Sequence, residues 1–186
     1  MVIAFNAVHN GANHPTGKHT GILIEAKDGD MYRNYRPGKI SIGAKILEVL
    51  KRYDLDSWEG SVKQKCPIFL HSFDDFTVEE WHSLGTNLPL HQLVEEATLG
   101  KNGKPSSLAD FAEKAAKYSH GLGVESTLVY DPVAKKPKKD VLDQIKALNM
   151  MLHVWTFRDD QLLFGAKDAI VMSMLFSKCT RLARMC

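Results

Sequence analysis

Short apolar runs alternate with amphipathic segments along most of the chain. Four runs, rich in branched or aromatic residues, lie at residues 21–27, 67–73, 88–94 and 151–157. Runs of this length, entered or left through Gly, Pro, Asn or Asp, predict buried strands. A further strand is predicted to begin near residues 126–129, after the glycine-containing segment 121–124. The pattern therefore predicts about five strands.

Between these runs, apolar residues recur every three or four positions, which is the period of a helix with one buried face. The stripes predict helices at residues 42–53, 77–82, 108–118, 141–148 and 165–176. Thr77, with a Glu three residues later, and Ser107 are predicted N-caps. Strands that alternate with helices predict parallel β/α units, arranged as an open doubly wound sheet or as part of an eightfold barrel.

The composition predicts a soluble protein whose partner is a small molecule, and it gives little further information about function. The 186 residues are 44% hydrophobic and carry a net charge of +2, so one domain with a buried core is expected. Basic residues are scattered except for residues 135–139, and no nucleic-acid surface is predicted. Cys66, Cys179 and Cys186 show no metal or disulfide spacing, which favours a reducing compartment. Neither a signal peptide nor a transmembrane segment is predicted.

Two opposite charges on the first predicted strand are the most informative candidates for chemistry. Side chains alternate faces along a strand, so Glu25 and Lys27 point the same way, together with Leu23. At the carboxyl end of a parallel strand, a carboxylate can hold a hard divalent cation and a lysine can neutralise phosphate. The alternative is a salt bridge at the strand end that faces water, and the spacing alone leaves both open.

Other polar motifs carry less information. His71 and Ser72 are neighbours on a strand and point to opposite faces, so Ser72 is not predicted to be a nucleophile, and Asp74 is predicted to cap the next turn. Trp155 lies on a predicted strand, where it could line a pocket or belong to the core.

Six further histidines show no metal-binding spacing, and most of these six are predicted to lie at the surface: His9, His14, His19, His82, His91 and His120. Phosphate-binding glycine loops are absent from the sequence, which excludes kinase and dehydrogenase functions.

Several segments resemble, in order, those of glycerophosphodiester phosphodiesterases. The run Glu25-Ala26-Lys27, with its lead-in at residues 13–18, resembles the Glu-Ile-Lys strand of that family. Residues 71–74 are similar to the Gln-Ser-Phe-Asp strand end, with His71 in place of Gln. Residues 88–93, 121–123 and 154–156 continue the order. The resemblance covers most of residues 10–160 and implies a partial (β/α)8 barrel of the TIM type.

The resemblance also implies a function and a site. Family members use a divalent metal, Ca²⁺ or Mg²⁺, to hydrolyse glycerophosphodiesters to glycerol 3-phosphate and an alcohol. The resemblance implies that Glu25 is a metal ligand and that Lys27 contacts the phosphate as the catalytic lysine. It also implies that Trp155 and Phe73 line the substrate site. The expected partner is a small-molecule glycerophosphodiester, with no nucleic acid.

The sequence also departs from the family pattern. Before the first strand, the family has a His-Arg-Gly strand, a Glu-x-Asp metal pair and a second catalytic histidine, and its last Phe-Thr-Asp-Phe-Pro strand is also missing here. The chain is therefore predicted to be one domain, residues 1–186, that lacks the first strands and the last strand of the barrel and has weak activity or none. Alternatives are a non-catalytic protein that binds phosphoglycerol compounds, a chain that associates through its open sheet edges to complete its barrel, and a likeness of fold alone.

Overall fold

The computed structural model describes residues 21–35 and 38–156. Its main sheet has five strands in the order β1 (Ile22–Ala26), β2 (Ile68–Ser72), β3 (Leu90–Val94), β4 (Gly121–Glu125) and β7 (Met151–Trp155). The pairs β1–β2 and β2–β3 are parallel. The predicted α/β class with parallel strands is therefore confirmed.

Helices connect these strands, as parallel pairing requires. In chain order they are α2 (Gly29–Asn34), α3 (Ile42–Lys51), α4 (Trp58–Lys63), α5 (Asp75–Ser83), the short 3₁₀ helix η1 (Glu96–Thr98), α6 (Leu108–Ala115), α7 (Ser126–Val129) and α8 (Lys139–Ala147). A two-stranded antiparallel ribbon, β5 (Tyr130–Asp131) with β6 (Lys136–Pro137), precedes α8. None of the helices in this part of the chain is long and apolar enough to cross a bilayer.

Within the described residues the chain forms two compact units, and each is treated by itself below. The first unit holds the residues up to Leu93 together with Lys117–Gly121, and the second holds residues 94–116 and those from Leu122 onward. The prediction that residues 1–186 form one domain stays a prediction.

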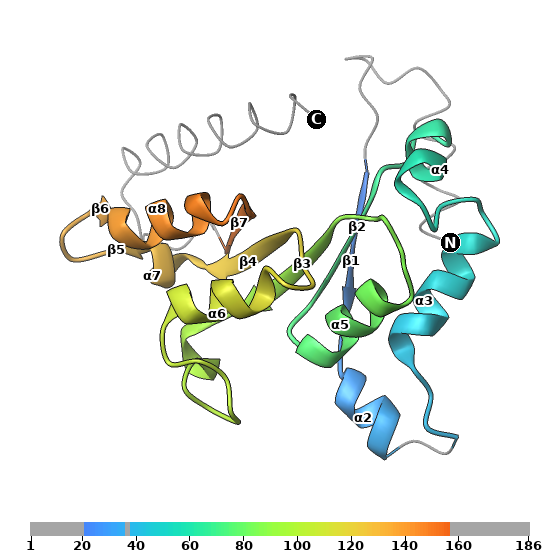
Figure 1. The fold of residues 1–186 in the computed structure, drawn as a ribbon, viewed down its shortest axis with the longest axis horizontal. Coiled ribbons are helices and arrows are strands. Elements are labelled where there is room, and N and C mark those ends of the chain that lie inside the picture. The colour runs from blue at the N-terminus through green and yellow to red at the C-terminus, as the bar shows by residue number, and fades with distance from the viewer. Residues whose placement is uncertain (1–20, 36–37, 157–186) are drawn as a thin grey trace. The chain divides into compact units, whose positions relative to one another are not determined.

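In the first unit, α3 packs side by side with α5 (Figure 1). The indole Nε1 of Trp81, which is fully buried, donates a hydrogen bond of 3.0 Å to the carbonyl oxygen of Gly43. The hydroxyl of Ser41, the N-cap of α3, donates a bond of 2.7 Å to the carboxylate of Glu80. These two bonds fix one helix against the other, and the buried Leu50 of α3 adds apolar contact area.

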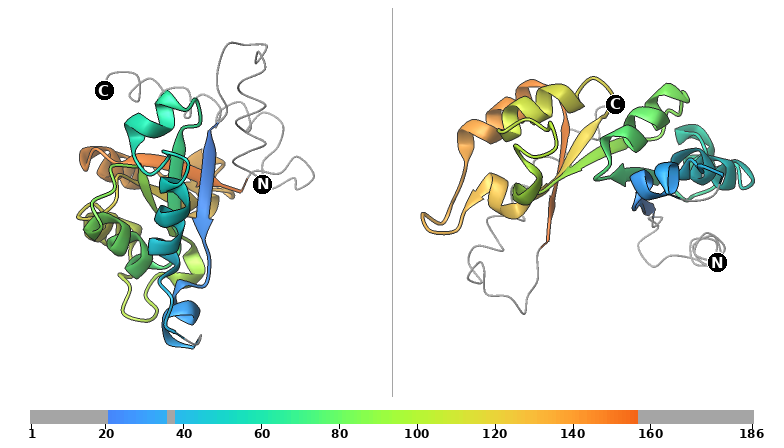
Figure 2. Two further views of the ribbon diagram at one scale, coloured as in Figure 1. Left: turned by 90° about the vertical axis from the view of Figure 1, so that its right-hand side faces the viewer. Right: turned by 90° about the horizontal axis from the view of Figure 1, so that it is seen from below.

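In the second unit, α6 lies beside α8, as the right-hand view of Figure 2 shows. The buried side of α6 carries Leu108, Phe111, Ala112 and Ala115, at the spacing of one helix face. Ile145 is the buried residue of α8. Ser107 caps α6 because its hydroxyl accepts a hydrogen bond from the backbone N–H of Asp110, as its sequence position predicted.

Some local predictions are wrong. The predicted strand start at residues 126–129 is instead the short helix α7, and the strand is β4, which comes directly before it. The helix predicted to begin at Thr77 begins at Asp75, so Thr77 lies in its first turn. The predicted helix at residues 165–176 lies outside the described residues.

Candidate functional site

The predicted pair on β1 lies at the carboxyl end of the strand. Glu25 is the fourth of the five residues of β1, and Lys27 follows the strand directly. The ammonium of Lys27 lies 2.7 Å from a carboxylate oxygen of Glu25. The Lys27 side chain is 70% exposed and that of Glu25 is 25% exposed, so the carboxylate is the more enclosed partner. The pair therefore forms the salt bridge that the spacing allowed, with its cation accessible from solvent.

Two histidines share the level of Glu25 on neighbouring strands. The register pairs Glu25 with His71 of β2, and His71 with His91 of β3. Residues that are paired in a parallel ladder project to the same face of the sheet, and neighbouring strands are about 4.8 Å apart. Glu25, His71 and His91 therefore form a row across three strands. This row is called the Glu–His–His row below.

Both histidines in the row are buried. His71 is 9% exposed and His91 is 6% exposed. His91 is an exception to the prediction that most of the scattered histidines lie at the surface, because it sits inside the buried strand β3. Its place within the apolar run at residues 88–94 was a signal that could have predicted its burial.

Buried hydrogen bonds tie the carboxyl ends of the three strands together. The hydroxyl of Ser72 donates a bond of 2.8 Å to the carbonyl oxygen of Ala26, the residue between Glu25 and Lys27. The side-chain amide of Gln92 donates a bond of 3.1 Å to the carbonyl oxygen of Ser72. Both side chains are fully buried, so these bonds form away from water. They hold the backbone that carries the charged pair against β2 and β3.

An ion pair joins the segments that follow β1 and β2. Arg33 of α2 donates two hydrogen bonds to Asp74, of 2.7 and 3.1 Å, and its guanidinium also lies over the ring of Phe76 at 4.1 Å. The hydroxyl of Thr77 donates to the same carboxylate. Burial would raise the pKa of Asp74, but the hydrogen bonds from Arg33 and Thr77 outweigh it and lower that pKa below its ordinary value.

The predicted cap at Asp74 takes a different form. Asp74 is the N-cap residue of α5, but its side chain accepts no bond from a backbone N–H of the helix. The carboxylate bonds to Arg33 and Thr77 instead, so it anchors α2 to α5.

The two predicted substrate-lining aromatics lie in different units. Phe73 directly follows β2 in the first unit and is partly exposed. Trp155 is the last residue of β7 in the second unit and is also partly exposed. Both stand at the carboxyl end of a strand. Their roles in substrate binding stay predictions.

The described residues do not by themselves make up a complete ligand set for Ca²⁺ or Mg²⁺. Among residues 21–35 and 38–156, no three His, Cys, Asp or Glu side chains are grouped so that they could hold a metal. Calcium takes six to eight oxygen ligands, and magnesium is held through one or two carboxylates together with waters and substrate phosphates. Glu25 supplies one carboxylate, and the other members of its row are imidazoles, which suit softer metals.

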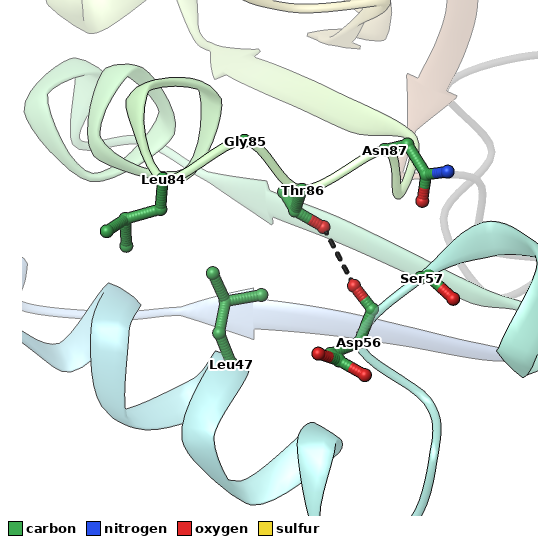
Figure 3. Close-up of a pocket in the computed structure, with 7 residues that line it drawn as sticks. All are labelled: Leu47, Asp56, Ser57, Leu84, Gly85, Thr86 and Asn87. Atoms are coloured by element: carbon green, nitrogen blue, oxygen red, sulfur yellow. Dashed lines mark hydrogen bonds between the residues drawn. The ribbon is translucent and has the colours of Figure 1, made fainter.

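A surface hollow of about 300 Å³ lies between α3 and two loops of the first unit (Figure 3). It is lined by Leu47, Asp56, Ser57, Leu84, Gly85, Thr86 and Asn87, which come from α3 and from the loops before α4 and before β3. The Thr86 hydroxyl donates to the backbone oxygen of Asp56, and the Asn87 side chain bonds to the backbone N–H of Trp58. These bonds connect the loops that line the hollow.

Comparison with known proteins gives matches at the level of structure. No model of a known protein family matches the sequence, and no curated protein matches it. The fold is similar to that of a protein from Silicibacter pomeroyi DSS-3 described as a glycerophosphoryl diester phosphodiesterase, with a TM-score of 0.58 and 15% identity. It is also similar to a protein from Galdieria sulphuraria described as a glycerophosphodiester phosphodiesterase, with a TM-score of 0.50 and 17% identity.

The chain has the fold of glycerophosphodiester phosphodiesterases. The resemblance predicted from the sequence is thereby confirmed for the fold, since the matches cover 92% and 90% of this chain. The chain spans about half of each solved structure, namely 48% and 53% of their lengths. The predicted TIM-type architecture is confirmed as well, and the five described strands form an open sheet instead of a closed barrel.

Proposed function

We propose that this chain carries part of a glycerophosphodiester phosphodiesterase site and hydrolyses glycerophosphodiesters to glycerol 3-phosphate and an alcohol, weakly when alone. The observation that carries the proposal is the charged pair Glu25 and Lys27 on one face of β1, at the carboxyl end of a parallel sheet. Active sites of barrel folds lie at that end of the strands. The likeness of fold to two proteins described as such phosphodiesterases supports it.

Each side chain of the pair has a role in this proposal. The exposed ammonium of Lys27 contacts a phosphate oxygen and stabilises negative charge as it builds up during the reaction. Glu25 is a metal ligand, and Phe73 and Trp155 contact the glycerol part of the substrate. Because Glu25 is not grouped with two further ligand side chains among the described residues, weak binding of Ca²⁺ or Mg²⁺ and a weak metal effect on the rate are expected.

A second candidate function is binding without turnover. One observation favours it: β1 lies at an open edge of the five-stranded sheet. In this case the chain binds phosphoglycerol compounds or completes its barrel with another chain through the open edge of β1. This second candidate predicts that glycerol 3-phosphate binds with an affinity that depends on Lys27 and that no product is released.

The test is release of glycerol 3-phosphate from glycerophosphocholine, measured with Ca²⁺, with Mg²⁺ and with a chelator. Glu25→Gln and Lys27→Met are compared with Glu48→Gln, a matched change at an exposed carboxylate of α3. The proposal expects turnover that Glu25→Gln and Lys27→Met abolish and Glu48→Gln leaves intact. A turnover rate that is unchanged in all three variants would refute the proposed site. Ligand binding to a folded chain without turnover would favour the second candidate.

A further inference from the structure

Two residues that the proposed function assigns to the substrate, Lys27 and Phe73, leave the sheet side by side. In the register of β1 with β2, Ala26 is paired with Ser72, and each is the last residue of its strand. Lys27 and Phe73 follow these two residues directly, so they leave the sheet at one level. The distance between them therefore depends on what holds the segments beyond the two strands together.

An ion pair joins these two segments. Arg33 lies in α2, the helix that follows Lys27, and Asp74 comes directly after Phe73. The guanidinium donates hydrogen bonds of 2.7 and 3.1 Å to the two carboxylate oxygens, a bidentate geometry that fixes both distance and orientation. Each side chain is only 20% exposed, so solvent screens this pair less than it screens an exposed one.

Two further groups fix the backbone around Phe73. The hydroxyl of Ser72 accepts a hydrogen bond of 3.1 Å from the backbone N–H of Asp74, and the side-chain amide of Gln92 donates one of 3.4 Å to the carbonyl oxygen of Phe73. Ser72 and Gln92 belong to the strands β2 and β3. Arg33 differs from them, because it links Asp74 to the segment that follows Lys27.

We propose that Arg33 is a positioning residue of the proposed site, an inference that rests on the proposed function. Through Asp74 it holds Phe73 at a fixed distance from Lys27, so that the ammonium meets the phosphate while the ring meets the glycerol part of the same diester. In this role Arg33 acts through Asp74 and does not touch the substrate. Its loss lets the segment after β2 move away from α2, which weakens substrate binding and changes the chemical step little.

The test is a double-mutant cycle of Arg33→Met with Phe73→Ala in the glycerophosphocholine assay. Each single change is expected to raise KM about tenfold, the factor typical of one apolar contact, with kcat little changed. In the Phe73→Ala background, Arg33→Met should raise KM no further, because the ring that Arg33 positions is gone. Arg52→Met is the matched control, since Arg52 pairs with Glu48 at the exposed end of α3 and should leave KM unchanged.

Two other variants separate positioning from stability. Gly29→Ala disturbs the ion pair without removing a charge, because a Cβ atom at Gly29 would overlap the carboxylate of Asp74. It should raise KM in the wild-type background but not in the Phe73→Ala background. Trp81→Phe removes a hydrogen bond between α5 and α3, so it should lower stability while KM of the folded protein stays unchanged.

The outcomes distinguish this inference from the proposed function. Turnover in which Arg33→Met and Phe73→Ala raise KM independently would overturn the inference and leave the proposed function standing. An unchanged KM in Arg33→Met, or an equal rise in Trp81→Phe, would do the same. If the wild type binds glycerol 3-phosphate without turnover, the proposed hydrolysis fails, and the same cycle is measured on the dissociation constant, where independent effects would again overturn the inference. A folded wild type with neither turnover nor binding would remove both.

Discussion

Replacing Asp74 by Ala should lower the free energy of unfolding by about 3 kcal/mol. Arg33 makes two hydrogen bonds to this carboxylate, and both side chains are only 20% exposed. Exposed ion pairs contribute up to about 1 kcal/mol, and breaking a buried pair costs about 3–5 kcal/mol. A pair that is four-fifths covered falls between these limits, at about 2 kcal/mol. The fully buried Thr77 also loses the acceptor of its hydroxyl, which costs about 1 kcal/mol more.

Urea unfolding, followed by circular dichroism, measures this loss. A double-mutant cycle with Arg33→Met isolates the ion pair from the contact of Arg33 with Phe76, and a coupling energy of about 2 kcal/mol is expected. Asp143→Ala is the control, because Asp143 forms an ion pair with Lys139 on the exposed side of α8. Its effect should be much smaller than that of Asp74→Ala.

The stabilisation from Asp74 should also depend on pH in one direction. Folding lowers the pKa of this carboxyl, so its contribution is complete above the unfolded pKa, about 3.9 for Asp, and disappears as pH falls through the lower folded pKa. The difference in stability between wild type and Asp74→Ala should therefore be constant near neutral pH and shrink in acid. Additive effects of the two substitutions at neutral pH would refute the argument, and so would a difference that grows in acid.

Two further substitutions test the buried hydrogen bonds. Ser72→Ala removes the donor to Ala26 and the acceptor of the Asp74 N–H, and should cost about 1–3 kcal/mol in urea unfolding; unchanged exchange of the Asp74 amide hydrogen would contradict this. Trp81→Phe keeps an aromatic ring in the core but leaves the carbonyl of Gly43 without its indole donor, so the melting temperature should fall by several degrees, and an unchanged temperature would contradict the role given to that bond.

The predictions succeeded where local pattern and tertiary burial agree. The runs that became β2 and β3 are apolar, and both strands are almost entirely buried, so their composition reflects their environment. The predictions failed where a few residues determine which element forms. Glu125 ends β4 and Ser126 begins α7 within a segment of branched residues that favours a strand by composition. No periodic stripe marks α2, which has six residues and follows Asp28 in the left-handed region at φ 56°.

For the site, the sequence could predict only relations within one strand. Alternation placed Glu25 and Lys27 on one face, and the structure joins them in an ion pair. The Glu–His–His row depends on register between strands, which the sequence of one strand does not determine. Likewise, the pairing of Arg33 with Asp74 spans 41 positions and follows from how β1 and β2 are aligned.

Buried polar side chains of the first unit gather near the carboxyl ends of β2 and β3. Four buried polar side chains lie in β2 and β3: His71, Ser72, His91 and Gln92. Burying polar groups has a free-energy cost that an apolar residue of similar size would avoid. Ser72 and Gln92 offset that cost by bonding the strand ends together. The two imidazoles project to the other face, beside Glu25, where a branched apolar residue would suit a strand better. Their position beside Glu25 is consistent with the proposed site at this end of the strands, where the pair of Glu25 and Lys27 also lies.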